Sequence, residues 1–129
     1  MYRVRLLSWN RTEAAERAEQ LQSAGFGVIH EPLDAAGLRA LRQDPPSAVV
    51  IDLGRAPSPG RDVALGLRKY RATRDVPLVF VGGEPKKVAR IKELLPDAVY
   101  TNWDDVGRSL ERAIAHPPAE PVVPESVFA

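Results

Sequence analysis

The sequence predicts an α/β domain in which helices cover both faces of a parallel five-stranded sheet. Two observations predict it. Short apolar, β-branched runs alternate with segments of helical spacing along residues 1–116, and two of these runs are apolar at consecutive positions, as in strands buried on both faces. The chain has 129 residues, the size of one ordinary domain.

Five apolar runs predict the strands. They lie at residues 4–7, 26–29, 48–53, 76–81 and 97–101. The runs AVVI and PLVFV predict strands in the middle of the sheet. Gly27 weakens the second run and is typical of an edge strand.

Apolar residues at helical spacing predict five helices between and after these strands. The marker positions are Ala14, Ala18 and Leu21; Ala35, Leu38 and Leu41; Val63, Leu67 and Tyr70; Val88, Ile91 and Leu95; and Val106, Leu110 and Ile114. Asn10 and Glu13 have the spacing of a capping box. Asp34 is typical of an N-cap, and Pro85 of a first-turn proline.

The pattern stops after His116, so we expect a domain over residues 1–116 and a proline-rich tail or linker over residues 117–129. The chain has no cysteine, which excludes disulfides and thiolate chemistry and fits a cytoplasmic protein. No apolar run is long enough for a signal peptide or a membrane span. The net charge of +1, with acids and bases interleaved, predicts binding neither to nucleic acid nor to a membrane.

Four short motifs carry a resemblance to a known family. They are AGF at residues 24–26, VVIDL ending just after Asp52, PGRD at residues 59–62 and VPLVFV at residues 76–81. In their order and spacing, residues 2–116 resemble the receiver domains of two-component response regulators. The resemblance implies a flavodoxin-like (βα)5 three-layer sandwich with strand order 2-1-3-4-5.

The resemblance also implies that Asp52 holds the position of a phosphoryl acceptor. In this family an acidic pair after the first strand binds Mg²⁺ beside the acceptor, with a Ser or Thr after the fourth strand and a Lys after the fifth. This chain has Ser8 and Trp9, followed by Asn10, for the acidic pair, Gly82 for the hydroxyl residue and Asn102 for the lysine. We therefore expect no Mg²⁺ site, no other cofactor and no phosphorylation, with Asp52 accepting hydrogen bonds from loop N–H groups near Gly54.

Two alternatives stay open at this point. Asp52 would be a working acceptor if a cation from the long loop that follows it, Arg55 or Arg61, replaced the missing charges. A small ligand could instead bind at the switch point of the sheet, beyond the carboxyl ends of the strands.

Other polar groups are less suited to a site. Gly82 and Gly83 before Lys86 and Lys87 could cradle a phosphate, but Pro85 removes an N–H donor and Glu84 adds negative charge. The basic residues Arg68, Lys69, Arg71 and Arg74 are expected on a solvated helix end. His30 and His116 lack metal-ligand spacing.

We expect the domain to be a non-enzymatic signalling module. Family members commonly associate through the fourth helix, fifth strand and fifth helix, which predicts a protein partner or a homodimer at that face. Its expected residues are Trp103, Arg90, Asp104, Arg108 and Arg112. Trp103 either covers the end of the core or stands partly exposed as an interface anchor.

Overall fold

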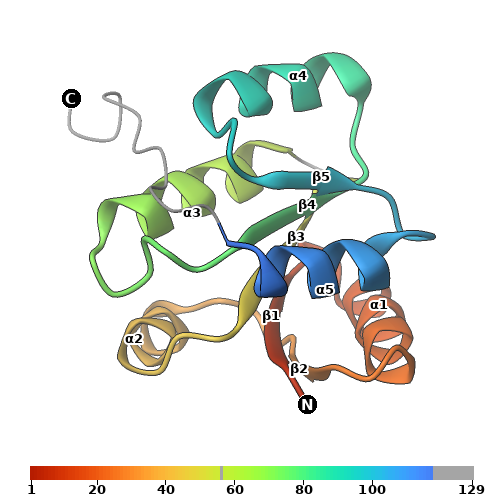
Figure 1. Ribbon diagram of the computed structural model, residues 1–129, viewed down its shortest axis with the longest axis vertical. Helices are drawn as coiled ribbons and strands as arrows, with labels where there is room; N and C mark the ends of the chain where they lie inside the picture. Colours follow the sequence, from red (N-terminus) through yellow and green to blue (C-terminus); the bar gives the residue numbers. More distant parts are fainter. Residues whose placement is uncertain (56, 118–129) are drawn as a thin grey trace.

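The computed structural model describes residues 1–55 and 57–117 of the protein. Five strands and five helices alternate along them (Figure 1). The strands are β1 (Arg3–Leu7), β2 (Gly27–Ile29), β3 (Ala48–Asp52), β4 (Leu78–Val81) and β5 (Val99–Thr101). The helices are α1 (Arg11–Ser23), α2 (Ala35–Gln43), α3 (Pro57–Lys69), α4 (Pro85–Leu94) and α5 (Val106–Ala115). Beyond its first residue, the expected tail over residues 117–129 lies outside the described residues.

The strands form one parallel sheet in the order β2-β1-β3-β4-β5, as the resemblance implies. β3 lies at the centre, with Val50 opposite Leu6 of β1 and Val79 of β4. β3 and β4 are buried at every position, which confirms the expectation from their continuous apolar runs. β2 is the half-exposed edge strand that Gly27 predicted.

Alternating strand residues divide the core into two layers. Val4, Leu6 and Val50 join the buried residues of α1 and α5 on one face of the sheet. Leu7 and Ile51 join those of α2, α3 and α4 on the other face. The fold is therefore a three-layer sandwich, visible in Figure 1 with α1 and α5 on one side and α2, α3 and α4 on the other.

The predicted helix starts are largely confirmed. The Asn10 side chain accepts a hydrogen bond from the Glu13 N–H at 3.0 Å, and the Asp34 side chain accepts one from the Gly37 N–H at 2.7 Å. Pro85 lies in the first turn of α4. The second half of the capping box is missing, because the Glu13 carboxylate binds Arg55 instead.

Several boundaries differ from the expectation. β4 and β5 each begin two residues later than their apolar runs, at Leu78 and Val99. α3 ends at Lys69, so Tyr70 is not part of its apolar face, and its ring instead packs under the Arg42 guanidinium at 3.6 Å. α3 also begins at Pro57, which makes the preceding loop shorter than expected and places Arg61 in the helix.

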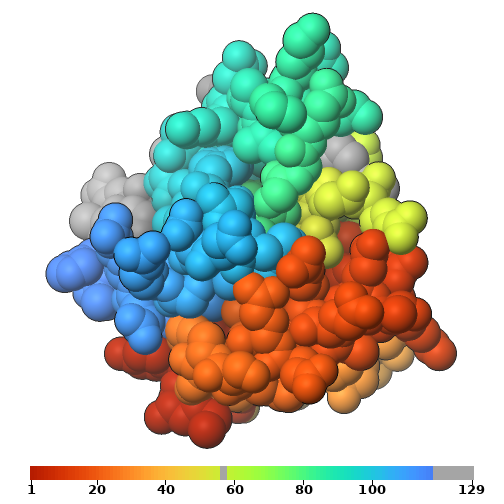
Figure 2. All heavy atoms as spheres, turned by 90° about the vertical axis from the view of Figure 1, so that its right-hand side faces the viewer, coloured from red at the N-terminus to blue at the C-terminus, as the bar shows by residue number. Residues whose placement is uncertain are grey.

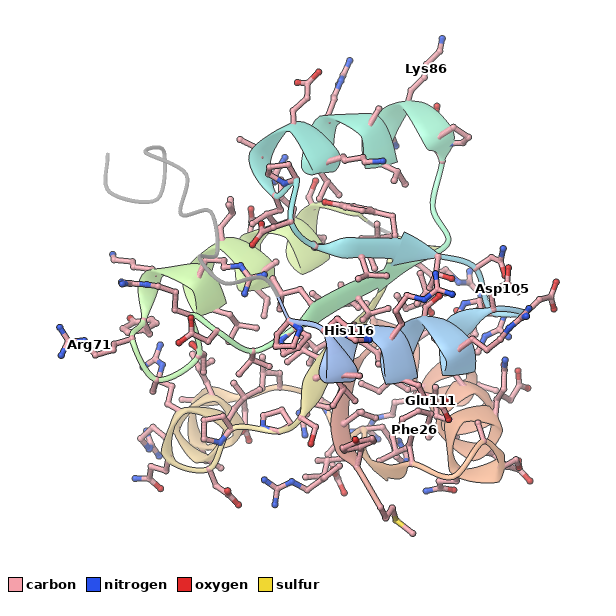
Figure 3. The ribbon with its side chains drawn as sticks, in the orientation of Figure 1. Phe26, Arg71, Lys86, Asp105, Glu111 and His116 are labelled. Atoms are coloured by element: carbon pink, nitrogen blue, oxygen red, sulfur yellow. The ribbon has the colours of Figure 1, made fainter. Side chains whose placement is uncertain are left out.

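Arg68 corrects the expectation of a solvated basic cluster. Its side chain is among the most buried in the protein, at 1% exposure. It donates hydrogen bonds to the carbonyl groups of Arg74 and Val76, at 2.7 and 2.9 Å, and lies 3.6 Å from the Asp97 carboxylate. Burial lowers the pKa of Arg68, but the bound carbonyls and Asp97 offset its desolvation. Arg71, in contrast, points away from the protein (Figure 3).

Candidate functional site

The carboxyl ends of the parallel strands lie at one edge of the sheet, where the loops after β1, β3, β4 and β5 meet. The β5 arrow points toward the right-hand side of Figure 1, and Figure 2 views the molecule from that side. In Figure 2 the start of α1, in orange, lies beside the start of α3, in yellow-green. This edge is where parallel α/β folds place their ligands.

Asp52 is the last residue of β3 and is only 7% exposed. Its Oδ1 accepts a hydrogen bond from the Gly54 N–H at 2.9 Å, as expected from the sequence. Its Oδ2 accepts a longer one from the Ser8 hydroxyl at 3.4 Å. Both carboxylate oxygens therefore already have partners within the protein.

A charge pair that the sequence analysis did not predict lies across the same edge. Arg55, in the loop after β3, binds the carboxylate of Glu13 in α1. Its Nε and one of its NH₂ groups donate hydrogen bonds to Glu13 Oε1, at 3.1 and 2.9 Å. These hydrogen bonds are the main reason that the pKa of Glu13 is lowered and the pKa of Arg55 raised, and the Asp52 charge adds a smaller increase for Arg55. Arg55 thus lies within electrostatic reach of Asp52 while its hydrogen bonds go to Glu13.

The other predicted pocket residues contribute little to Asp52. Gly82 and Gly83 have φ angles of 74° and 92°, the left-handed conformation that glycine adopts readily. The Asn102 side chain exchanges hydrogen bonds with Asp105, at 2.9 and 3.1 Å, ahead of α5. Asn102 therefore stabilises the turn into α5 instead of supplying a charge partner.

Among known proteins, solved structures match this chain, and they share its fold. No family model and no curated protein matches the sequence. A sensor protein from Polaromonas sp. matches in structure with a TM-score of 0.73 and 23% identity, over 88% of this chain and 96% of that one. The receiver domain of a sensor histidine kinase from Pseudomonas aeruginosa, which holds a magnesium ion in its active-site cleft, matches with a TM-score of 0.70 and 16% identity, over 89% and 98% of the two chains. A chemotaxis protein from Vibrio cholerae matches with a TM-score of 0.68 and 15% identity, over 87% and 98%.

The chain has the receiver-domain fold. Five parallel strands in the order 2-1-3-4-5 with five helices match these structures along nearly their whole length. At these identities the likeness establishes the fold, and the site has to be judged from its own residues.

The receiver domain from Pseudomonas aeruginosa holds a magnesium ion in its active-site cleft, which raises the question of whether the residues here could hold one. Mg²⁺ binds oxygen ligands and is usually held by one or more carboxylates. Within residues 1–55 and 57–117 no group of three His, Cys, Asp or Glu side chains could hold a metal ion. Ser8 and Trp9 offer no carboxylate, and the nearby Glu13 carboxylate binds Arg55. These residues do not fit a Mg²⁺ site of the usual receiver kind.

The remaining sequence candidates lie apart from Asp52. Lys86 points outward from α4 (Figure 3), and Lys87 lies 3.9 Å from Glu84. Arg61 pairs with its neighbour Asp62 at 3.2 Å. His116 lies at the end of α5, whereas His30 lines a hollow near α1. Among the described residues, no helix is both long and apolar enough to cross a membrane.

The expected partner residues do not all share one surface. Trp103 packs partly buried against the core layer of α1 and α5, with the Arg17 guanidinium 4.5 Å from its ring centroid and its carbonyl bound to Gln20 at 2.6 Å. Trp103 therefore covers the end of the core on the α1 side. Arg90 lines a hollow with Ser58 and Arg61 of α3, which places it on the α3 side of α4.

The surface over α4, β5 and α5 has other members. Lys92 of α4 lies 5.7 Å from the Tyr100 ring of β5. Arg108 of α5 is 82% exposed along its side chain and pairs with Asp105 at 2.9 Å. Arg112 and Asp104 are also exposed. The predicted surface thus keeps its mixed charges, while its aromatic component is Tyr100 and not Trp103.

Proposed function

We propose that this domain is a signalling module of the two-component type that acts by binding a protein and not by accepting a phosphoryl group at Asp52. The receiver fold supports the first part of this proposal. The environment of Asp52 supports the second part, because both its oxygens accept hydrogen bonds and Glu13, the carboxylate that lies nearby, is bound to Arg55. The module would be cytoplasmic and non-enzymatic.

The proposal that Asp52 does not accept a phosphoryl group rests on the lack of positive charge around it. A transferred phosphoryl group carries negative charge that must be neutralised in the transition state, usually by Mg²⁺ and a fixed cation. Here Gly82 stands where a hydroxyl is needed and Asn102 where a lysine is needed. Arg55 is the cation nearest to this role, but its fork is occupied by Glu13. Phosphorylation would require that ion pair to open first.

We propose that the partner binds over α4, β5 and α5. This surface, defined by Lys92, Tyr100, Asp104, Arg108 and Arg112, offers charges of both signs around an aromatic ring. Mixed charges suit a self-complementary contact between two copies, in which each acid meets a base related by the two-fold axis. The partner we propose is therefore a second copy or another receiver-like domain.

Two measurements test whether Asp52 is inert. The protein is incubated with Mg²⁺ and a small acyl phosphate and its intact mass is recorded, while Trp9 fluorescence is followed in a Mg²⁺ titration. We expect no gain of one phosphoryl mass and no saturable quench at millimolar Mg²⁺. A mass gain that disappears in Asp52→Ala would establish the working acceptor instead, and its loss in Arg55→Gln would identify the cation responsible.

A further inference from the structure

A hollow beside Asp52 is not accounted for by the proposed function. It has a volume of about 310 Å³ and lies between the loop after β1, the loop after β2 and α3. Leu7, Leu33 and Val63 contribute apolar side chains to its lining, and Ser8, Arg11 and Glu31 contribute polar ones. A neighbouring hollow of about 320 Å³ shares the lining residues Ser8, Arg11, Glu31 and Pro32 with it. This position, at the carboxyl ends of the strands, is where small molecules bind in parallel α/β folds.

Trp9 forms one wall of the hollow and is unusually exposed, at 42%. The ring reaches α3 at Gly60, where an added Cβ would lie 3.7 Å from Trp9 Cη2 and only 2.6 Å from Ile51 Cγ2. The absent side chain lets α3 approach the sheet closely and lets the indole lie against the helix. Val63, one helical turn further along α3, then continues the same apolar wall. An exposed indole beside apolar lining residues is suited to packing against a flat or apolar ligand.

Two opposite charges lie among the residues around the hollow. Arg11, the first residue of α1, is exposed and makes no ion pair with any residue in 1–55 or 57–117. Glu31 is 76% exposed along its side chain, and its carboxylate is 3.8 Å from Arg5, too long for a strong bond. Arg11 favours a carboxylate on the ligand, and the start of α1 adds to that preference. Glu31 would repel a simple anion but would attract an ammonium group.

We propose that this hollow binds a small zwitterion with an apolar or aromatic body, the chemistry of a free hydrophobic α-amino acid. The apolar body would pack between Trp9 and Val63, with the carboxylate at Arg11 and the ammonium group at Glu31. Ser8 lines the hollow and also donates its hydroxyl to Asp52, so a bound ligand would contact a direct neighbour of the acceptor position. The inference goes beyond the proposed function and does not depend on whether Asp52 is phosphorylated.

The test uses L-phenylalanine as the probe and Trp9 fluorescence as the readout. Trp103→Phe serves as the background, because the chain has two tryptophans and this change leaves Trp9 alone. We expect a saturable change in fluorescence with a dissociation constant of about 1 mM or lower. Phenylpropionate, which lacks the ammonium group, and phenethylamine, which lacks the carboxylate, should each bind about tenfold more weakly.

Variants in the same background locate the site. Val63→Phe should fill the hollow and abolish the change, and Arg11→Gln should weaken binding about tenfold. Arg71→Gln is the matched control, since Arg71 is an exposed arginine outside the hollow, and it should bind like the background. Circular dichroism confirms that each variant is folded.

Three results would overturn the proposal. The first is the absence of a saturable change up to about 10 mM phenylalanine. The second is binding that Val63→Phe and Arg11→Gln leave intact, which would place the ligand elsewhere. The third is phenylpropionate binding as tightly as phenylalanine, which would make the hollow a carboxylate site. None of these results bears on the mass or Mg²⁺ measurements at Asp52, so the two proposals can fail separately.

Discussion

Asp52 ends the central strand of the sheet, and its hydrogen bonds give it a structural task. The Gly54 N–H turns back to Asp52 Oδ1 at 2.9 Å and so holds the first turn of the loop after β3. A side chain that is only 7% exposed cannot easily exchange this acceptor for water. The same carboxylate can therefore be kept for stability when its chemistry is absent.

Two substitutions of Asp52 distinguish a structural hydrogen-bond acceptor from a buried carboxylate that destabilises the fold. Asp52→Asn keeps an oxygen for the Gly54 N–H and should change the free energy of unfolding little. Asp52→Ala leaves that N–H without an acceptor and should cost about 1 kcal/mol. Chemical denaturation measures both values. A higher free energy of unfolding for both variants would mean that Asp52 destabilises the fold and has no structural role.

Gly82 shows why a hydroxyl cannot simply be restored at the fourth strand. Its φ of 74° strains any residue with a Cβ, although no atom within 4 Å would block the side chain. We expect Gly82→Ser to cost about 1 kcal/mol in thermal or chemical unfolding. Gly66→Ala is the matched control, because Gly66 lies in α3 with equal space and a helical backbone, and it should gain about 0.5–1 kcal/mol. Equal effects at the two glycines would contradict this account of Gly82.

Between elements, the forked pair of Arg55 and Glu13 joins the loop after β3 to the first turn of α1. Both side chains are partly exposed, at 62% and 36%, so solvent weakens their attraction. The pair directs the loop arginine that lies near Asp52 toward α1. It also explains why Asn10 caps α1 without the reciprocal bond from Glu13.

This pair makes a small part of the stability depend on pH. Hydrogen bonding to Arg55 lowers the pKa of Glu13 in the folded state, so its stabilisation is fully present above the ordinary glutamate pKa. It is lost as the pH falls through the lowered folded pKa. We expect wild type to be more stable than Glu13→Gln at neutral pH and equal to it under acidic conditions, in urea denaturation at a series of pH values. The double variant Glu13→Gln with Arg55→Gln is the control, and a difference that persists in acid would assign the effect to another contact.

The predictable part of the fold follows from local patterns. Strand burial follows from continuous apolar runs such as AVVI, and helix starts follow from Asn10, Asp34 and Pro85, whereas the strand order came from the family resemblance. Side-chain direction at element ends depends on tertiary contacts. The sequence therefore left open whether Trp103 covers the core or stands exposed, and the structure packs it against the core beside Arg17 of α1. One missed feature did have a signal. Arg68 occupies a position in the buried stripe of α3 with Ala64 and Leu67, where an arginine must be paired inside the protein.

The candidate site was predictable in its location and less so in its contacts. Parallel strands bring the residues after β1 and β3 to one edge whatever their side chains, so Ser8 and Asp52 meet as expected. The pairing of Glu13 with Arg55 depends on how closely the loop passes α1, which no local pattern encodes. Asn102 was placed at this edge by alignment, but its short side chain reaches Asp105 first.

At the scale of the whole molecule, the surface over α4, β5 and α5 is where we propose that a partner binds. A stable contact between two copies should bury about 800 Å² on each copy. Arg108 lies near the start of α5, and its exposed side chain forms an ion pair with Asp105. Charge reversal at this position would place two acids side by side.

We expect wild type to self-associate with rising concentration in sedimentation velocity, without added phosphoryl donor. Arg108→Glu should shift the protein toward monomer because it repels Asp105 and the facing acids of the second copy. Arg71→Glu carries the same charge reversal at an exposed site outside the surface and should sediment like wild type. A wild type that stays monomeric at every concentration would leave a different protein as the partner, and a dimer insensitive to Arg108→Glu would place the interface elsewhere.

The buried arginine of α3 also connects segments that are far apart in the sequence. Arg68 fastens the residues ahead of β4, through the carbonyls of Arg74 and Val76, and the residue Asp97 ahead of β5. The segments that enter β4 and β5 are thus both held to α3 by one side chain. Replacing Arg68 would therefore remove the shared partner of two strand starts and of the Asp97 carboxylate, and not only empty a place in the core.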